Sequence, residues 1–166
     1  MAESLIPDQT RALVGQAISE PVSGTIVAKE SQRYAYAVDD LNPIYFDEAA
    51  ATAAGYRTLV APPTYVAHVV AQHAPVASMR EDGIYRGGTA RHRIELRVKR
   101  VMFGGEEWEF LAPAYVGDTI SALTRLHSLE EKSGGSGPFV LQTVETTYTN
   151  QLGEVVARGR TKGIAR

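Results

Sequence analysis

The sequence of 166 residues contains no cysteine. Disulfide bonds, thiolate metal sites and a cysteine nucleophile are therefore excluded. Long apolar runs are also missing, because no stretch approaches the roughly 18 consecutive apolar residues that a membrane-spanning helix needs. The N-terminus reads MAESLIPDQT, which has neither the basic start nor the apolar core of a signal peptide. These absences predict a soluble, cytoplasmic protein.

An excess of positive charge is missing as well. The chain has 17 Lys and Arg residues against 19 Asp and Glu residues, which gives a net charge of -2. Nucleic-acid-binding proteins concentrate Lys and Arg on one face, so we expect no nucleic-acid partner. The hydrophobic fraction of 44% and the charged fraction of 22% are typical of a globular protein. The length predicts one domain over residues 1–166, with residues 1–17 as a helical N-terminal extension.

The first half of the chain carries helix signals. Ser31 stands where an N-cap is favoured, and Pro43 disfavours helix at the residue before it. Asp47 is a second candidate N-cap, and Gly55 is expected to end the helix that Asp47 begins. Together these signals predict four helices, over residues 6–14, 32–38, 48–54 and 65–79; the last is the longest and most apolar, with Pro75 in its final turns.

The second half changes to a period of two, which is typical of half-buried strands. Strands are predicted at 91–100, 107–111, 119–129, 138–149 and 154–164, joined by the Gly-rich loop 133–137 and the turn 150–153. Hairpin connections predict an antiparallel meander. A short early strand at 25–27 is a candidate sixth member. The fold class is α+β: a long apolar helix with a curved antiparallel sheet wrapped around it.

Polar residues gather at one helix end. Asp40, Asn42 and Pro43 precede Tyr45, and the run Ala61-Pro62-Pro63-Thr64-Tyr65 leads into the apolar helix. Polar groups at a helix end beside an apolar helix can shape a small-molecule pocket. We therefore select this region as the candidate site.

The spacing Asp-x-Asn-Pro-Ile, then Ala-x-x-x-Gly-Tyr, then Ala-Pro-Pro-Thr resembles the MaoC-like hydratases, and is most similar to the FAS1-like dehydratase N-terminal domain. The stretches 105–110, 116–119 and 145–150 are also similar to that group. The resemblance covers residues 31–166. It implies a hot-dog fold, a dimeric habit and (R)-specific hydration of an enoyl thioester, or the reverse dehydration, without a metal or cofactor.

The resemblance also implies an Asp–His pair, five positions apart. Asp40 matches the aspartate, but the histidine position holds Tyr45. A general base should have a pKa near the working pH. Imidazole has a pKa of about 6.5 and a tyrosine phenol about 10, so tyrosine needs a shift costing about 4 kcal/mol. Tyr45 can still be a proton donor or a structural hydroxyl, and a desolvated Asp40 can itself be a base.

A second departure concerns the oxyanion hole. The family supplies an N–H from a glycine at the helix start, and that position holds Pro63, which has no N–H. Loss of one such donor costs on the order of a hundredfold in rate. Some chains of the FAS1-like group are non-catalytic halves that help to hold the acyl chain beside an intact MaoC-type subunit, and this chain resembles them. Predicted substrate-binding residues are Asn42, Tyr45, Pro63, Thr64 and Tyr65.

Alternatives remain open. The chain can be a self-sufficient hydratase that uses Asp40, a non-enzymatic acyl-CoA-binding protein, or a thioesterase, since one fold serves several functions. Asp40 can instead be a helix-end residue, and Tyr45 a packed aromatic. His68 and His73 are candidate replacements for the imidazole. The basic residues of 91–100 are either a solvated face or a site for coenzyme A phosphates. Expected partners are an acyl-CoA or acyl carrier protein thioester, and a second hot-dog subunit in a homodimer or heterodimer.

Overall fold

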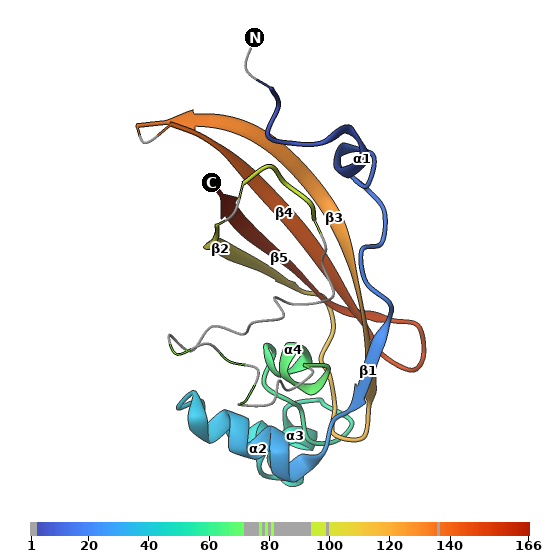
Figure 1. Ribbon diagram of the computed structural model, residues 1–166. Helices are drawn as coiled ribbons and strands as arrows, with labels where there is room; N and C mark the ends of the chain where they lie inside the picture. Colours follow the sequence, from blue (N-terminus) through green and yellow to red (C-terminus); the bar gives the residue numbers. More distant parts are fainter. Residues whose placement is uncertain are drawn as a thin grey trace.

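The computed structural model describes residues 3–71, 77, 79, 81, 94–98, 100–135 and 137–166. Within these residues, five strands form one antiparallel sheet in the order β1-β3-β4-β5-β2. The strands are β1 Val22–Thr25, β2 Val101–Phe110, β3 Thr119–Gly134, β4 Gly137–Thr149 and β5 Val155–Ala165. The sheet is strongly curved, and three helices gather at one end of it: α2 Ala28–Ala37, α3 Glu48–Ala53 and α4 Tyr65–Val69 (Figure 1). This is the α+β hot-dog arrangement that the sequence predicts.

The long hairpins follow from strict alternation of buried and exposed residues. Along β3, the side chains of Ile120, Ala122, Thr124 and Leu126 are buried on the concave face. Asn150 forms the β4–β5 turn, because its side-chain oxygen accepts hydrogen bonds from the N–H groups of Leu152 and Glu154, both at 3.0 Å. The predicted strands after residue 119 are confirmed and extend beyond the predicted ends.

The predicted meander is wrong at β2. This strand pairs with β5 rather than with β3, so residues 111–118 carry the chain across the end of the sheet. A predicted strand over 91–100 is also not observed, since residues 94–98 and 100 are not in a strand. Arg97 instead donates its N–H to the carbonyl of Leu5 at 2.9 Å. A period of two shows that one face of a segment is buried. It does not show whether that segment pairs within the sheet or with the N-terminal segment.

Early residues do join the sheet. β1 pairs with β3, and residues just before β1 continue along the same edge, where Ala17 forms a bridge with Arg125. Ile6, which is 1% exposed, packs with Val140 and Ala165 at the far end of the concave face. The N-terminal segment therefore covers both the β3 edge and part of that face.

Two helices are shorter than predicted, one is longer, and one matches to within a residue. The N-terminal helix is the single turn α1, Asp8–Arg11. Helix α2, Ala28–Ala37, begins before Ser31, which is buried inside it rather than capping it, since Ala28, Lys29 and Glu30 also favour helix. The helix α3, Glu48–Ala53, is confirmed: the Asp47 carboxylate accepts the N–H of Ala49 at 2.8 Å.

The predicted long helix over 65–79 is wrong in length. Helix α4 spans Tyr65–Val69, Val70 is its C-cap, and Ala71 is not helical. Consecutive β-branched valines at positions 69 and 70 disfavour continuation. Residues 72–76 and 78 lie outside the described residues, as does His73. No helix in the described part of the chain is both long enough and apolar enough to cross a membrane.

The main core joins α4 to the concave face. Tyr65, Val66 and Val70 pack with residues of all the long central strands: Ile120, Ala122, Tyr148, Val156 and Ala157. Gly24 of β1 faces the carbonyl oxygen of Val69, and an added Cβ would overlap that oxygen. The absence of a side chain at Gly24 therefore allows α4 to pack against β1.

We expect the Gly24→Ala variant to be less stable by about 1–3 kcal/mol, because α4 must shift to relieve the overlap. Gly135→Ala is the matched control, since nothing lies within 4 Å of its added Cβ. Denaturant unfolding of both variants measures the difference. Equal stability of the two would contradict the close packing of α4 on β1.

Candidate active site

A sharp turn at the end of α2 presents the candidate aspartate. After the C-cap at Val38, Asp39 has a φ of 56°, a left-handed conformation that Asp tolerates. The N–H of Asp40 then donates to the carbonyl of Ala35 at 3.0 Å. This backbone hydrogen bond closes the helix end and fixes the position of Asp40.

Asn42 and Pro43 turn the chain back toward Asp40. The side-chain oxygen of Asn42 accepts a hydrogen bond from the N–H of Ile44 at 3.3 Å, and Pro43 begins the 3₁₀ turn Pro43–Tyr45. The phenol of Tyr45 consequently points at Asp40, and its hydroxyl donates to Asp40 Oδ2 at 3.1 Å. The two positions that the sequence selected therefore meet.

Tyr45 is a neutral hydrogen-bond donor. Its side chain is buried, and the residue is 6% exposed. Burial raises the pKa of Tyr45 from 10.0 to about 12, and the neighbouring negative charge of Asp40 and the hydrogen bond to it act in the same direction. At neutral pH the phenol keeps its proton and donates a hydrogen bond to Asp40.

A pocket of about 440 Å³ adjoins Tyr45, and Asp40 is not among its lining residues. Asn42, Tyr45 and Pro63 contribute to its wall, and the other side is formed by the end of β2 and the start of β5. Among the described residues, the remaining lining is mostly apolar and includes no charged side chain: Ile44, Tyr56, Val60, Ala61, Val66, Phe110, Leu111, Ala112, Pro113, Ala114, Val156 and Ala157. Such a lining suits an apolar group or chain.

Backbone hydrogen bonds hold the walls of the pocket together. Val60 donates its N–H to the carbonyl of Ile44 at 3.2 Å, and Ala61 donates to Ala114 at 2.9 Å. Three segments distant in sequence are thereby joined around one cavity. The pocket is therefore shaped mainly by tertiary pairing.

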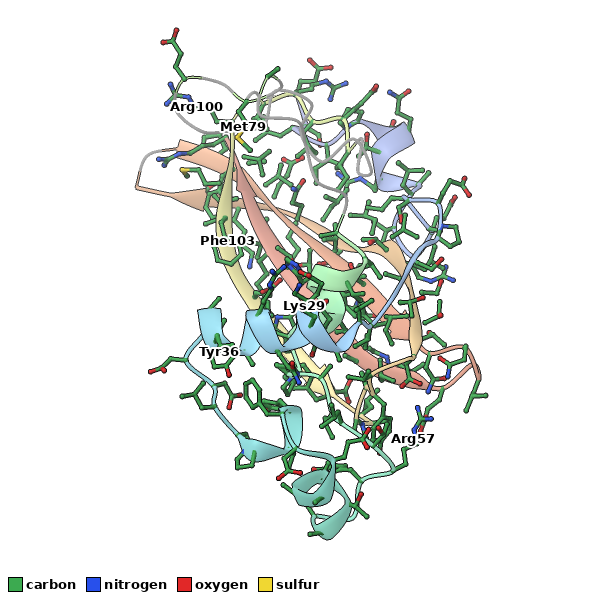
Figure 2. The ribbon with its side chains drawn as sticks, turned by 90° about the horizontal axis from the view of Figure 1, so that it is seen from below. Lys29, Tyr36, Arg57, Met79, Arg100 and Phe103 are labelled. Carbon is green, nitrogen blue, oxygen red and sulfur yellow. The ribbon has the colours of Figure 1, made fainter. Side chains whose placement is uncertain are left out.

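The buried carboxylate of Asp118 holds together the loops that surround the pocket. It is 1% exposed, and it accepts hydrogen bonds from Arg57, from Gln151 at 2.9 Å and from the N–H of Tyr115 at 2.9 Å. Burial alone would raise the pKa of Asp118, but the hydrogen bonds from Gln151, Arg57 and Tyr115 outweigh it and lower the pKa. Arg57 also lies over the Tyr115 ring, 4.2 Å from its centre. Figure 2 places Arg57 well away from Met79 and Arg100.

Thr64 and Tyr65 do not line this pocket. The hydroxyls of Thr64 and Tyr34 lie 2.9 Å apart. Tyr65 is 3% exposed and packs in the core, with its ring 5.4 Å from both Tyr34 and His68. Burial raises the pKa of Tyr65. His68 contacts these rings rather than the pocket lining, and a role of Thr64 or Tyr65 in substrate binding stays a prediction.

Other candidates lie elsewhere or outside the described residues. His92, Arg91, Arg93 and Lys99 are among the residues that are not described. Arg97 binds the N-terminal segment through Glu3, with 2.9 Å between Nη2 and the carboxylate. Within the described residues, no group of three or more His, Asp or Glu side chains is arranged to hold a metal ion.

The pocket residues on β2 and β5 were not predicted from the sequence. Phe110 and Ala157 look like ordinary strand residues, and only their register pairing brings them together opposite the Asp40 turn. The sequence offers no local signal for them. Asp118 lies in the stretch 116–119 that resembled the family, but its role as an anchor needed the structure.

Comparison with known structures assigns the fold. The chain superposes on a chain of the ChsH1–ChsH2 complex from Mycobacterium tuberculosis with a TM-score of 0.70 and 20% identity, covering 95% of this chain and 86% of that one. It superposes on a chain of the HadBC (3R)-hydroxyacyl-ACP dehydratase complex from the same organism with a TM-score of 0.61 and 22% identity, covering 87% and 94%. The superposition on the R-hydratase PhaJ1 from Pseudomonas aeruginosa has a TM-score of 0.61 and 18% identity, and it covers 92% of this chain and 81% of that one. The fold that this chain shares with these structures is the hot-dog fold.

The family follows from the sequence comparison. Residues 12–159 match the FAS1-like dehydratase domain region, and the chain belongs to that family. A UPF0336 protein of Streptomyces coelicolor is 24% identical over 94% of both chains. A probable enoyl-CoA hydratase alpha subunit of Thermomonospora curvata is 31% identical over 90% of this chain, and the match spans 48% of that protein.

The raised pKa of Tyr45 predicts a pH dependence. The folded protein keeps this proton to about pH 12, whereas a free tyrosine loses it near 10.0. The stabilisation is therefore complete below pH 10 and is lost as the pH rises through 12. Between pH 10 and pH 12 we expect the free energy of unfolding to fall less in Tyr45→Phe than in the wild type. Urea titrations at each pH measure this fall. Tyr36→Phe, at an exposed tyrosine, is the control, and identical profiles for wild type and Tyr45→Phe would contradict the assignment.

Proposed function

We propose that this chain is the substrate-binding, non-catalytic subunit of an (R)-specific enoyl thioester hydratase or 3-hydroxyacyl thioester dehydratase. A MaoC-type partner subunit supplies the complete Asp–His pair. One observation carries the proposal: the position of the base holds Tyr45, a buried neutral phenol that donates to Asp40. A buried phenol of this kind donates a proton near pH 7 rather than accepting one, so Tyr45 does not replace the histidine of the family pair as a base.

Pro63 supports the same proposal. It lines the pocket at the position where the family supplies an N–H to the thioester carbonyl. Proline has no N–H to donate. The developing negative charge of the reaction would therefore lack one of its donors at this pocket.

The pocket itself is suited to the acyl part of the substrate. Its lining is largely aliphatic and aromatic, and none of the described side chains in it is charged. Burial of apolar chain in such a cavity is favourable by about 25 cal/mol per Å². The chain thus keeps a place for the acyl group although the base and the oxyanion donor are altered.

The edge of β2 supports a hot-dog partner. In the described part of the chain no strand pairs with its outer side, and β2 is one of the two edge strands of the sheet, the other being the short strand β1. Exposed apolar side chains follow this edge, and Phe103 is 73% exposed (Figure 2). An unpaired apolar edge strand is a site for sheet extension by another chain. We place the partner subunit there.

We expect the purified chain alone to show no hydration of crotonyl-CoA, measured by loss of the enoyl absorbance. Mixed with a MaoC-type subunit that carries an intact Asp–His pair, the chain should form an active complex. Robust activity of the chain alone would overturn the proposal. In the complex, Asp40→Asn should leave the rate unchanged, because the partner provides the base. Loss of activity in that variant would instead favour a self-sufficient hydratase that uses Asp40.

We also expect Phe103→Glu to weaken association with the partner by at least about tenfold, because it places a charge on an apolar contact surface. Leu152→Glu is the matched control, since Leu152 is 78% exposed on the β4–β5 turn, away from β2. Sedimentation or calorimetric titration measures both. Equal effects of the two changes would exclude the β2 edge as the interface.

A further inference from the structure

Among the described residues, three polar side chains interrupt the apolar lining of the pocket, and two of them are phenols. The three are Asn42, Tyr45 and Tyr56. Asn42 is exposed to solvent, and its amide oxygen accepts the N–H of Ile44 at 3.3 Å. The two phenols are more enclosed, because Tyr45 is buried and Tyr56 is half-buried. The hydrogen bonds of these two hydroxyls therefore decide which polar group a ligand can carry into the pocket.

The proton of the Tyr45 hydroxyl is already engaged. It is donated to Asp40 Oδ2 at 3.1 Å, and Asp40 is not among the lining residues. A hydroxyl oxygen whose proton is engaged keeps a lone pair that can accept a hydrogen bond. Tyr45 therefore offers the pocket an acceptor.

Tyr56 has the opposite character. Its backbone N–H donates to the carbonyl of Ala51 at 3.0 Å, and its ring packs edge-on against the ring of Tyr115, with 6.4 Å between the ring centres. These contacts hold the backbone and the ring of Tyr56. Within the part of the chain that the structure describes, no group accepts a hydrogen bond from its hydroxyl. Tyr56 therefore offers the pocket a donor.

The two phenols lie close together. Tyr56 packs against the core cluster that contains Tyr45, Ala35 and Val60. Burial and the charge of Asp40 contribute most to the raised pKa of Tyr45, and the charge of an ionised Tyr56 adds to them. No hydrogen bond joins the two hydroxyls directly. Their proximity lets one small group of a ligand reach both.

An acceptor beside a donor suits a hydroxyl group better than a carbonyl or a hydrocarbon. A ligand hydroxyl can donate to Tyr45 and accept from Tyr56 at the same time, whereas a carbonyl oxygen can only accept. A methylene does neither. By displacing water from the pocket it would leave the Tyr56 hydroxyl without an acceptor, which lowers affinity.

We infer that Tyr45 and Tyr56 select an acyl chain that carries a hydroxyl, so that this chain binds a 3-hydroxyacyl thioester more tightly than the thioester without the hydroxyl. This rests on the proposed function, which takes the pocket ligand to be the acyl group and places its hydroxyl on carbon 3. Asp40 is a positioning residue in this arrangement, because by accepting the Tyr45 proton it fixes Tyr45 as the acceptor.

The experiment is calorimetric titration of the purified chain with (R)-3-hydroxyoctanoyl-CoA, 3-oxooctanoyl-CoA and octanoyl-CoA, which have the same chain length. We expect the hydroxy ligand to bind about tenfold more tightly than octanoyl-CoA, because it makes two additional hydrogen bonds. The oxo ligand should bind about threefold more tightly, because it makes one.

The variant Tyr56→Phe removes the donor and keeps the ring. The hydroxy ligand then retains only the bond to Tyr45, so its advantage over octanoyl-CoA should fall to about threefold, and the advantage of the oxo ligand should vanish. Tyr115→Phe is the matched control, since Tyr115 contacts Tyr56 but does not line the pocket. It should keep both ratios.

Equal affinity of the wild type for the three ligands overturns the inference and leaves the proposed function standing. Wild-type ratios in Tyr56→Phe overturn it as well. If Tyr56→Phe does not fold, the order of the three ligands on the wild type decides. If none of the three binds, the proposed function fails and the inference fails with it. If the chain alone hydrates crotonyl-CoA, only the proposed non-catalytic role fails, and the ratios still decide the inference.

Discussion

The apolar side of α4 packs against the concave face of β3, β4 and β5, and the rest of the site depends on this contact. Tyr65 and Val66 lie in the same core as Ala122, Tyr148 and Ala157. Pro63, immediately before the helix, and Val66 within it are thereby held at the pocket wall. Gly24 permits the close approach from the β1 side. If α4 moved, the pocket would lose one of its walls.

The Asp40–Tyr45 hydrogen bond is the chemical consequence of that scaffold. The turn at Asn42 and Pro43 returns Tyr45 to Asp40, and burial of the phenol keeps it protonated. The same geometry that would place an imidazole beside a carboxylate in an intact hydratase here places a neutral donor. The proposed role as a binding subunit rests on this preserved shape with altered proton chemistry.

Side-chain size along β5 adjusts the concave face. Ala157 leaves space for the pocket, and Gly159 leaves space for the Trp108 indole. On the other face, Arg158 and Arg160 pair with Glu109 and Glu145. Exposed pairs of this kind contribute little to stability. The contribution of β5 to stability therefore comes mainly from its inner side, where the pocket is formed.

Local chemistry in the sequence determined the α3 cap at Asp47, the long hairpins after residue 119, and the turn that carries Asp40, Asn42 and Tyr45. Each depends on neighbours within a few positions, and so do the two altered positions, Tyr45 and Pro63. The lengths of the helices, the pairing of β2 with β5, and the meeting of Phe110 and Ala157 with the Asp40 turn were decided only by the tertiary structure. These depend on contacts between residues far apart in the chain, and no periodicity or capping signal records which distant strand a segment will join.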